Sequence, residues 1–130
     1  MPTGSLRRRP GGRGRRGRSC GLASRAIAVS VITAAEIHEA AFSSSNPDAR
    51  IAGLRAFLQP FQLLGVNEPI AIRFAEIRAY LRRRRQIISD FDILLGATAL
   101  HHDLTVLTFN RRHFERIPDL RLYHADDGQV

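Results

Sequence analysis

Two carboxylates, Asp90 and Asp92, stand at the start of an apolar segment and are the side chains of this chain best placed to do chemistry. Residues 93–100 are apolar or small almost throughout, so we expect a helix that is buried rather than amphipathic. Ser89 or Asp90 can cap its first turn. Asp92 would then lie at the edge of the core, where an ionised carboxylate is costly unless it has a partner such as a metal ion.

The same pair of residues also has a simpler interpretation. Acidic residues are common in the first turn of a helix because they complement its dipole, an effect of roughly 0.3–1 kcal/mol. This segment alone therefore does not decide whether Asp90 and Asp92 are helix caps or metal ligands. The elements around the pair bear on the choice between them.

Basic charge is concentrated at the amino end of the chain. The net charge is +8 over 130 residues, and all 20 basic residues are arginine. Eight of these arginines precede residue 26, where there is no acidic residue, and the other 12 are matched by the 12 acidic residues of the chain. A basic chain often indicates nucleic-acid binding. Here that argument applies to the leader and only weakly to the folded part.

Cysteine usage and hydropathy exclude several classes of protein. The single cysteine, Cys20, allows neither a disulfide within the chain nor a thiolate zinc site. No run of about 18 apolar residues is present, so we expect no membrane span. The Arg-rich leader lacks the apolar stretch of a secretory signal, and the expected location is the cytoplasm.

The composition predicts three regions. Residues 1–25 form an Arg/Gly-rich leader that we expect to be disordered, residues 26–124 form the folded domain, and residues 125–130 form a frayed tail. The leader has three interpretations: an arm that binds nucleic acid, a solvated tail without a role, or translation of GC-rich DNA from a wrong start or frame. We expect the last of these most.

After the leader, strand-like and helix-like patterns alternate along the chain. Strands are expected at 26–32, 61–66, 104–107 and 120–123, and helices at 34–42, 49–59, 68–85 and 90–102, with a turn and short helix over 108–114. Such alternation is typical of an α/β layer fold with a parallel sheet. Ligands in these folds sit beyond the carboxyl ends of the strands. Glu36, Asp92 and Asn110 all fall near that edge.

Three stretches, residues 30–37, 88–100 and 104–118, resemble the PIN-domain ribonucleases, and most closely the VapC toxins of bacterial toxin–antitoxin pairs. The similarity runs from about Ile27 to Tyr123, in order and with family-like spacing. It implies a PIN-like three-layer α/β fold with a mostly parallel sheet. It also implies an RNA substrate, a cognate antitoxin protein and a homodimer.

The resemblance assigns roles to the polar residues at the sheet edge. Glu36 and Asp92 would be carboxylate ligands of Mg²⁺ or Mn²⁺, which prefer oxygen donors. Asn110 and Thr108 would complete the catalytic set as supporting polar groups. Asp90 lies about 200° around a helix from Asp92, so we expect it to be a cap or to act behind the ligands.

Basic residues near this site have weaker assignments. Arg111 and Arg112 are candidates to steer RNA toward it, because they follow Asn110 directly. The histidines show no spacing typical of a metal cluster, and a structural or surface role is expected for each of them: His38, His101, His102, His113 and His124.

One family feature is absent from the sequence. The family opens with a strand that ends in a metal-binding Asp and lies at the centre of the sheet, whereas no Asp or Glu precedes Glu36 here. Because residues 1–25 show no strand pattern, we expect the first, central strand to be missing and the chain to be truncated or mis-started at its amino end. Two functions follow: a VapC-like metal-dependent endoribonuclease neutralised by an antitoxin, or a catalytically inactive PIN-like module that binds an antitoxin or nucleic acid.

Overall fold

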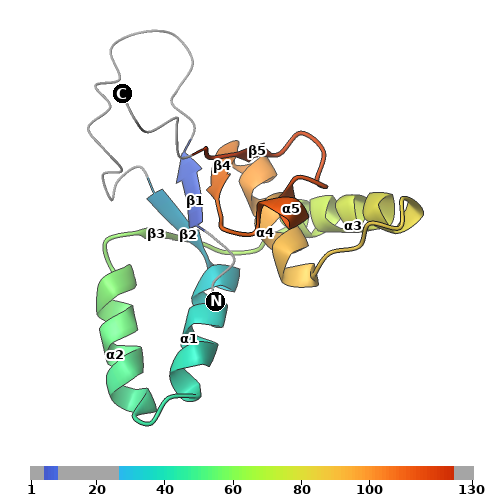
Figure 1. The fold of residues 1–130 in the computed structure, drawn as a ribbon. Coiled ribbons are helices and arrows are strands. Elements are labelled where there is room, and N and C mark those ends of the chain that lie inside the picture. The colour runs from blue at the N-terminus through green and yellow to red at the C-terminus, as the bar shows by residue number, and fades with distance from the viewer. Residues whose placement is uncertain (1–4, 9–26, 125–130) are drawn as a thin grey trace, which may run out of the picture.

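The computed structural model describes residues 5–8 and 27–124 of the chain. Within these residues a five-stranded sheet has the order β3-β2-β1-β4-β5 (Figure 1). Its strands are β1 (Ser5–Arg8), β2 (Ile27–Ser30), β3 (Gln62–Leu64), β4 (Leu104–Leu107) and β5 (Arg121–Leu122). Strand β2 runs parallel to β3, and β4 runs parallel to β5. Both β2 and β4 are antiparallel to β1, so the other four strands share one direction.

Helices connect the parallel strands, as the alternating pattern predicted. They are α1 (Val31–Phe42), α2 (Pro47–Leu58), α3 (Glu68–Arg83), α4 (Asp90–His101) and the short α5 (Arg111–Phe114). Pro47 stands in the first turn of α2, where its missing N–H costs nothing. An α/β fold with parallel strands interleaved with helices is therefore confirmed. None of the described helices combines the length and apolar content that crossing a membrane requires.

The centre of the sheet differs from the sequence prediction. No strand was expected within residues 1–25, yet β1 lies between β2 and β4 and pairs with both. The physical reason is non-local: two parallel strands with unpaired inner edges offer hydrogen bonds to any extended segment between them. The remaining leader residues lie outside the described part. Since β1 is antiparallel, its amino end, at Ser5, lies beside Leu107 at the carboxyl end of β4.

The boundary between β2 and α1 also differs from the prediction, which placed a strand over 26–32 and a helix from 34. The strand ends at Ser30, and α1 begins at Val31. Ser30 is buried, and its hydroxyl oxygen accepts a hydrogen bond from the Ile32 N–H at 3.1 Å. A serine cap at this point outweighs the β preference of the β-branched residues after it.

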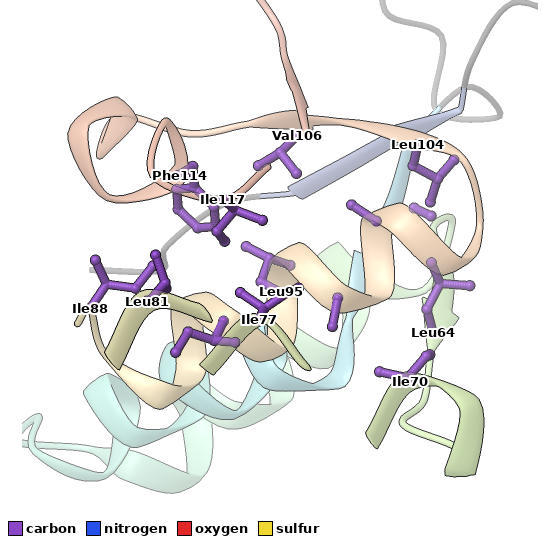
Figure 2. Close-up of a cluster of buried hydrophobic side chains, with 14 residues drawn as sticks. Leu64, Ile70, Ile77, Leu81, Ile88, Leu95, Leu104, Val106, Phe114 and Ile117 are labelled. Carbon is purple, nitrogen blue, oxygen red and sulfur yellow. The ribbon is translucent and has the colours of Figure 1, made fainter. Parts of the chain in front are cut away.

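The core forms where α3 and α4 pack together and against the segment that follows β4. Figure 2 shows Leu95 of α4 among Ile77 and Leu81 of α3, with Phe114 and Ile117 nearby. Helix α3 carries an apolar stripe in which Ile70, Ile77 and Leu81 are buried and Phe74 packs partly buried against the core. Helix α4 is buried along most of its length, as expected, and this holds its first turn firmly in place.

Helices α1 and α2 pack against each other and form a two-helix arm that projects from the sheet (Figure 1). The arm contributes little to the main core, since α2 has no buried residue. Large apolar side chains are exposed on it, including Phe42 at 67% and Phe57 at 63%. The arm therefore presents apolar surface that the described part of the chain leaves uncovered.

Candidate functional site

Asp92 lies in the first turn of α4 and is only 1% exposed. Ser89 is the N-cap of this helix, and its hydroxyl oxygen accepts a hydrogen bond from the Asp92 N–H at 3.2 Å. The residues that follow are apolar and buried. Helix α4 therefore begins at the edge of the core, and its first turn places the Asp92 carboxylate inside the protein. The carboxylate lies near the positive end of the helix dipole.

The two carboxylate oxygens of Asp92 have different surroundings. Oδ2 lies 2.8 Å from Nδ1 of His113 on α5. A carboxylate that is ionised can only accept, and Nδ1 is then the donor of this bond. Oδ1 is also buried, yet it has no hydrogen-bond partner among the described residues. The carboxylate is thus held on one side and unsatisfied on the other.

A buried carboxylate oxygen without a partner is expensive, because it has lost its water and gained nothing in return. Such a group persists in a folded protein when something else binds it, and a divalent cation is the partner that its charge suits best. Oxygen ligands are what Mg²⁺ prefers, and this ion is usually held by one or two carboxylates while keeping several waters. Asp92 therefore fits the metal ligand predicted from the sequence.

Glu36, the second predicted ligand, lies on α1 and is half-buried. Helix α1 packs against α4, so the two carboxylates come from neighbouring helices. In the described part of the chain, no group of three or more His, Cys, Asp or Glu side chains could hold an ion by itself.

Thr108 and Asn110 lie in the turn between β4 and α5. The Thr108 hydroxyl oxygen accepts a hydrogen bond from the Asn110 N–H at 3.0 Å, and this bond shapes the turn. Asn110 is exposed and is the N-cap residue of α5, but its side chain makes no capping hydrogen bond to that helix. The amide is therefore available at the carboxyl end of β4, at the edge where the sequence placed it.

Asp90 has a different environment from Asp92. It is the first residue of α4, and of the two caps that the sequence left open, Ser89 is the one observed, which excludes the cap role for Asp90. Its carboxylate accepts a hydrogen bond at 2.9 Å from Nε of Arg78 on α3, with both side chains substantially exposed. An exposed pair of this kind contributes little to stability. Asp90 and Asp92 face different surroundings, as their spacing around the helix predicted.

The two arginines after Asn110, Arg111 and Arg112, have different contacts. Arg111 donates from Nη1 to the backbone carbonyl oxygen of Tyr123 at 2.9 Å, and its Nε lies 3.7 Å from Oε1 of Glu115. The bond to Tyr123 holds the segment just after β5 against α5, whereas the contact with Glu115 is local, four residues along the chain. Arg112 is exposed and makes no ion pair with any described residue, so its charge is free to meet an anion.

His113 is the residue of this site that the sequence did not reveal. It is 21 positions from Asp92 in the chain, and nothing in their spacing pairs them. The sequence offered only an indirect signal for His113. A short helix was expected after the third predicted strand, and one face of such a helix must turn back toward the start of α4. Phe114, which is fully buried next to His113, fixes that face.

Comparisons with known proteins bear on the family and the fold of the chain. A family model described as PIN domain matches residues 16–120. The tRNA(fMet)-specific endonuclease VapC of Salmonella typhimurium is 31% identical over 96 residues, which cover 74% of this chain and 73% of that protein. Ribonuclease VapC2 of Haemophilus influenzae is 34% identical over 95 residues, covering 73% of this chain and 72% of that protein.

Solved structures show the same similarity in three dimensions. The DNA-bound VapBC structure from Salmonella typhimurium superposes with a TM-score of 0.70 at 31% identity, covering 74% of this chain and 73% of that one. The FitAcB structure from Neisseria gonorrhoeae gives 0.65 at 28% identity, covering 75% and 73%. In the Salmonella structure, VapBC is bound to DNA.

Proposed function

Because the chain belongs to the PIN domain family and, within it, to the VapC ribonuclease toxins of VapBC toxin–antitoxin systems, we propose that it is a metal-dependent endoribonuclease that cleaves RNA phosphodiester bonds. The observation that carries the proposal is the Asp92 carboxylate, which is buried and has one oxygen without a partner in the described part of the chain. A purely structural aspartate at a helix start would be solvated or fully hydrogen-bonded.

The residues divide the work as follows. Asp92 and Glu36 would hold Mg²⁺ or Mn²⁺, whereas Asp90, whose carboxylate pairs with Arg78, would not bind the ion directly. When bound, the ion lowers the pKa of a coordinated water and neutralises charge that develops on the phosphate. Asn110 and Thr108 supply an amide and a hydroxyl at the carboxyl end of β4, where they can orient the attacking water or the scissile phosphate.

The rim of the site carries groups that suit RNA. Arg112 is exposed and unpaired among the described residues, and it can contact a backbone phosphate. Phe109 is fully exposed next to Asn110 and offers a flat apolar face on which an unpaired base can stack. Arg111 was also a candidate for steering RNA, but its bond to the Tyr123 carbonyl makes Arg112 the better choice.

Replacing Arg112 by alanine should weaken RNA binding while leaving the chemistry intact. We expect KM at low salt to rise about 3- to 10-fold with kcat unchanged, and the salt dependence of binding to fall by about one unit of log–log slope. Steady-state cleavage of a fluorescent RNA at several salt concentrations measures both. Arg116→Ala removes the same charge from an exposed position farther from Asn110 and serves as the control. Equal effects of the two variants would rule out a specific phosphate contact at Arg112.

We also propose that a cognate antitoxin covers the groove of the two-helix arm. This groove has a volume of about 550 Å³ and is lined by Ala34, His38, Arg55, Ala56, Leu58, Gln59, Phe61 and Leu63. Its apolar lining beside basic groups suits an amphipathic segment that carries acidic residues. The antitoxin complexes among the structural relatives support a partner of this kind.

A charge placed in the groove should disrupt this complex. Ala56→Glu alters an exposed position of α2, so we expect an intact fold, unchanged RNA cleavage and at least a tenfold loss of antitoxin affinity, about 1.4 kcal/mol. Calorimetric titration with the purified antitoxin measures the affinity. Ala75→Glu, at an exposed position of α3, is the matched control. If both variants bind as tightly as the parent, the antitoxin docks elsewhere.

Family resemblance further implies a homodimer, which light scattering would detect as twice the chain mass of 14.5 kDa. A mass that stays at one chain over the micromolar range would contradict it. Dimer formation and antitoxin binding are proposals separate from the ribonuclease activity, because neither of them uses the Asp92 carboxylate.

A second candidate function rests on one specific observation. No Asp or Glu precedes Glu36. Strand β1 lies at the centre of the sheet, and its amino end is at the edge where the family's first strand presents its Asp. A catalytically inactive module that binds an antitoxin or nucleic acid would have this appearance. RNA cleavage by the purified full chain with Mg²⁺ or Mn²⁺ separates the two: metal-dependent cleavage supports the ribonuclease, and RNA binding without cleavage supports the module.

A further inference from the structure

The contact between His113 and Asp92 joins two elements that are distant in the sequence. Nδ1 of His113, on α5, lies 2.8 Å from Oδ2 of Asp92, on α4. The two side chains differ sharply in exposure, since that of Asp92 is 2% exposed and that of His113 is 43% exposed. The imidazole therefore closes one side of a buried carboxylate. Within the described residues, no other side chain donates a hydrogen bond to this carboxylate.

We infer that His113 is a positioning residue for the proposed metal site: it holds Oδ2 of Asp92 and thereby turns Oδ1 toward the cation. A free carboxylate can rotate and present either oxygen, or both, to a ligand. A charge-assisted hydrogen bond to one oxygen removes that freedom and leaves a single oxygen to bind. Groups behind a metal ligand commonly change metal affinity by 10- to 100-fold in this way. This inference rests on the proposed function.

A merely structural contact would have different consequences. If His113 only stabilised the fold, its loss would lower the melting temperature but leave the folded protein's affinity for metal unchanged. If it positions Asp92, its loss would free the carboxylate, and metal affinity would fall even where the protein stays folded. For this role, position 113 needs an N–H donor and not the imidazole ring itself. Asparagine at the same position can present an amide N–H close to where Nδ1 lies, whereas leucine cannot.

The test measures Mn²⁺ binding to the full chain by electron paramagnetic resonance, with the metal alone as the probe. We expect His113→Leu to weaken Mn²⁺ binding 10- to 100-fold and His113→Asn to stay within about threefold of the parent. Circular dichroism confirms that each variant is folded under the conditions of the titration. Equal Mn²⁺ affinity in the parent and in folded His113→Leu would overturn the inference, and so would equal losses in both variants.

A second measurement needs neither metal nor activity. Side-chain nitrogen spectra of the histidines report which ring nitrogen carries the proton, and we expect the Nδ1–H form for His113 in the metal-free protein. Asp92→Asn should change that signal because it removes the charged acceptor. A His113 that carries its proton only on Nε2 would overturn the inference. If instead the parent protein binds no Mn²⁺ while the Nδ1–H signal is present, the proposed function fails and the His113–Asp92 bond stands.

Discussion

Asp92→Asn should abolish metal-dependent RNA cleavage, with a loss of at least about 10³-fold in kcat/KM, or about 4 kcal/mol of transition-state stabilisation. The amide keeps the size of the carboxylate and can still accept a hydrogen bond from His113. It no longer carries the negative charge that the unpartnered Oδ1 offers to a cation. Cleavage of a defined RNA under saturating Mg²⁺ or Mn²⁺, compared with the parent protein, gives the result directly.

The same substitution should leave the fold intact. It replaces a buried charge by a neutral group, so we expect the melting temperature without metal to be unchanged or higher. Addition of Mn²⁺ should raise the melting temperature of the parent and not that of the variant, because only a state that binds the ion gains stability from it. A variant that loses activity and melts early would have lost its structure, and circular dichroism distinguishes the two outcomes.

Asp90→Asn is the matched control, two residues away on the same helix. Asp90 is exposed and paired with Arg78, and an exposed ion pair of this type is worth about 0–1 kcal/mol. We expect kcat/KM to fall no more than a few-fold. A loss as large as that of Asp92→Asn would place Asp90 among the direct ligands, and full activity of Asp92→Asn would contradict the assignment of Asp92.

Phe114→Ala should produce the largest change in stability, a loss of about 3–5 kcal/mol in the free energy of unfolding. Phe114 is fully buried and packs beside Ile117 in the core that α3 and α4 share with the segment after β4 (Figure 2). It also anchors α5, the helix that carries His113. Because that anchor holds the Nδ1 donor against Asp92, we expect weaker Mn²⁺ binding in the molecules that remain folded.

Urea unfolding followed by circular dichroism measures the free energy for Phe114→Ala. Phe114→Leu keeps most of the apolar volume and should lose less than about 1.5 kcal/mol, so it remains folded if the alanine variant does not. Phe109→Ala removes a fully exposed ring from the same segment and should change stability by less than about 0.5 kcal/mol. A small loss in Phe114→Ala would mean that α5 is held mainly by other contacts.

Local patterns in the sequence predicted most of the fold. The run 104–107 is β4 as expected, α4 starts at Asp90 as expected, and the stripe of α3 is buried. These elements follow from periodicity, capping and burial within a few neighbouring residues. Their boundaries shift where a single cap decides, as at Ser30, and where strands shorten to the residues that find partners, as β3 does at Gln62–Leu64.

The parts that the sequence did not predict depend on contacts between distant segments. Strand β1 exists through pairing with β2 and β4, which no local pattern in an Arg-rich segment indicates. The bond from His113 to Asp92 depends on how α5 packs against α4. Asp92 could be singled out because its place in the first turn of an apolar helix puts it at the edge of the expected core. Its partner, and the oxygen left without one, emerge only from the packed structure.

We propose that Oδ1 of Asp92 binds the divalent ion of a VapC-family ribonuclease. The most direct measurement is anomalous diffraction from crystals of the full chain soaked in Mn²⁺. We predict an anomalous peak in direct contact with Oδ1 of Asp92, while Oδ2 stays bonded to His113. No peak at Asp92, under Mn²⁺ concentrations that support RNA cleavage, would contradict the claim.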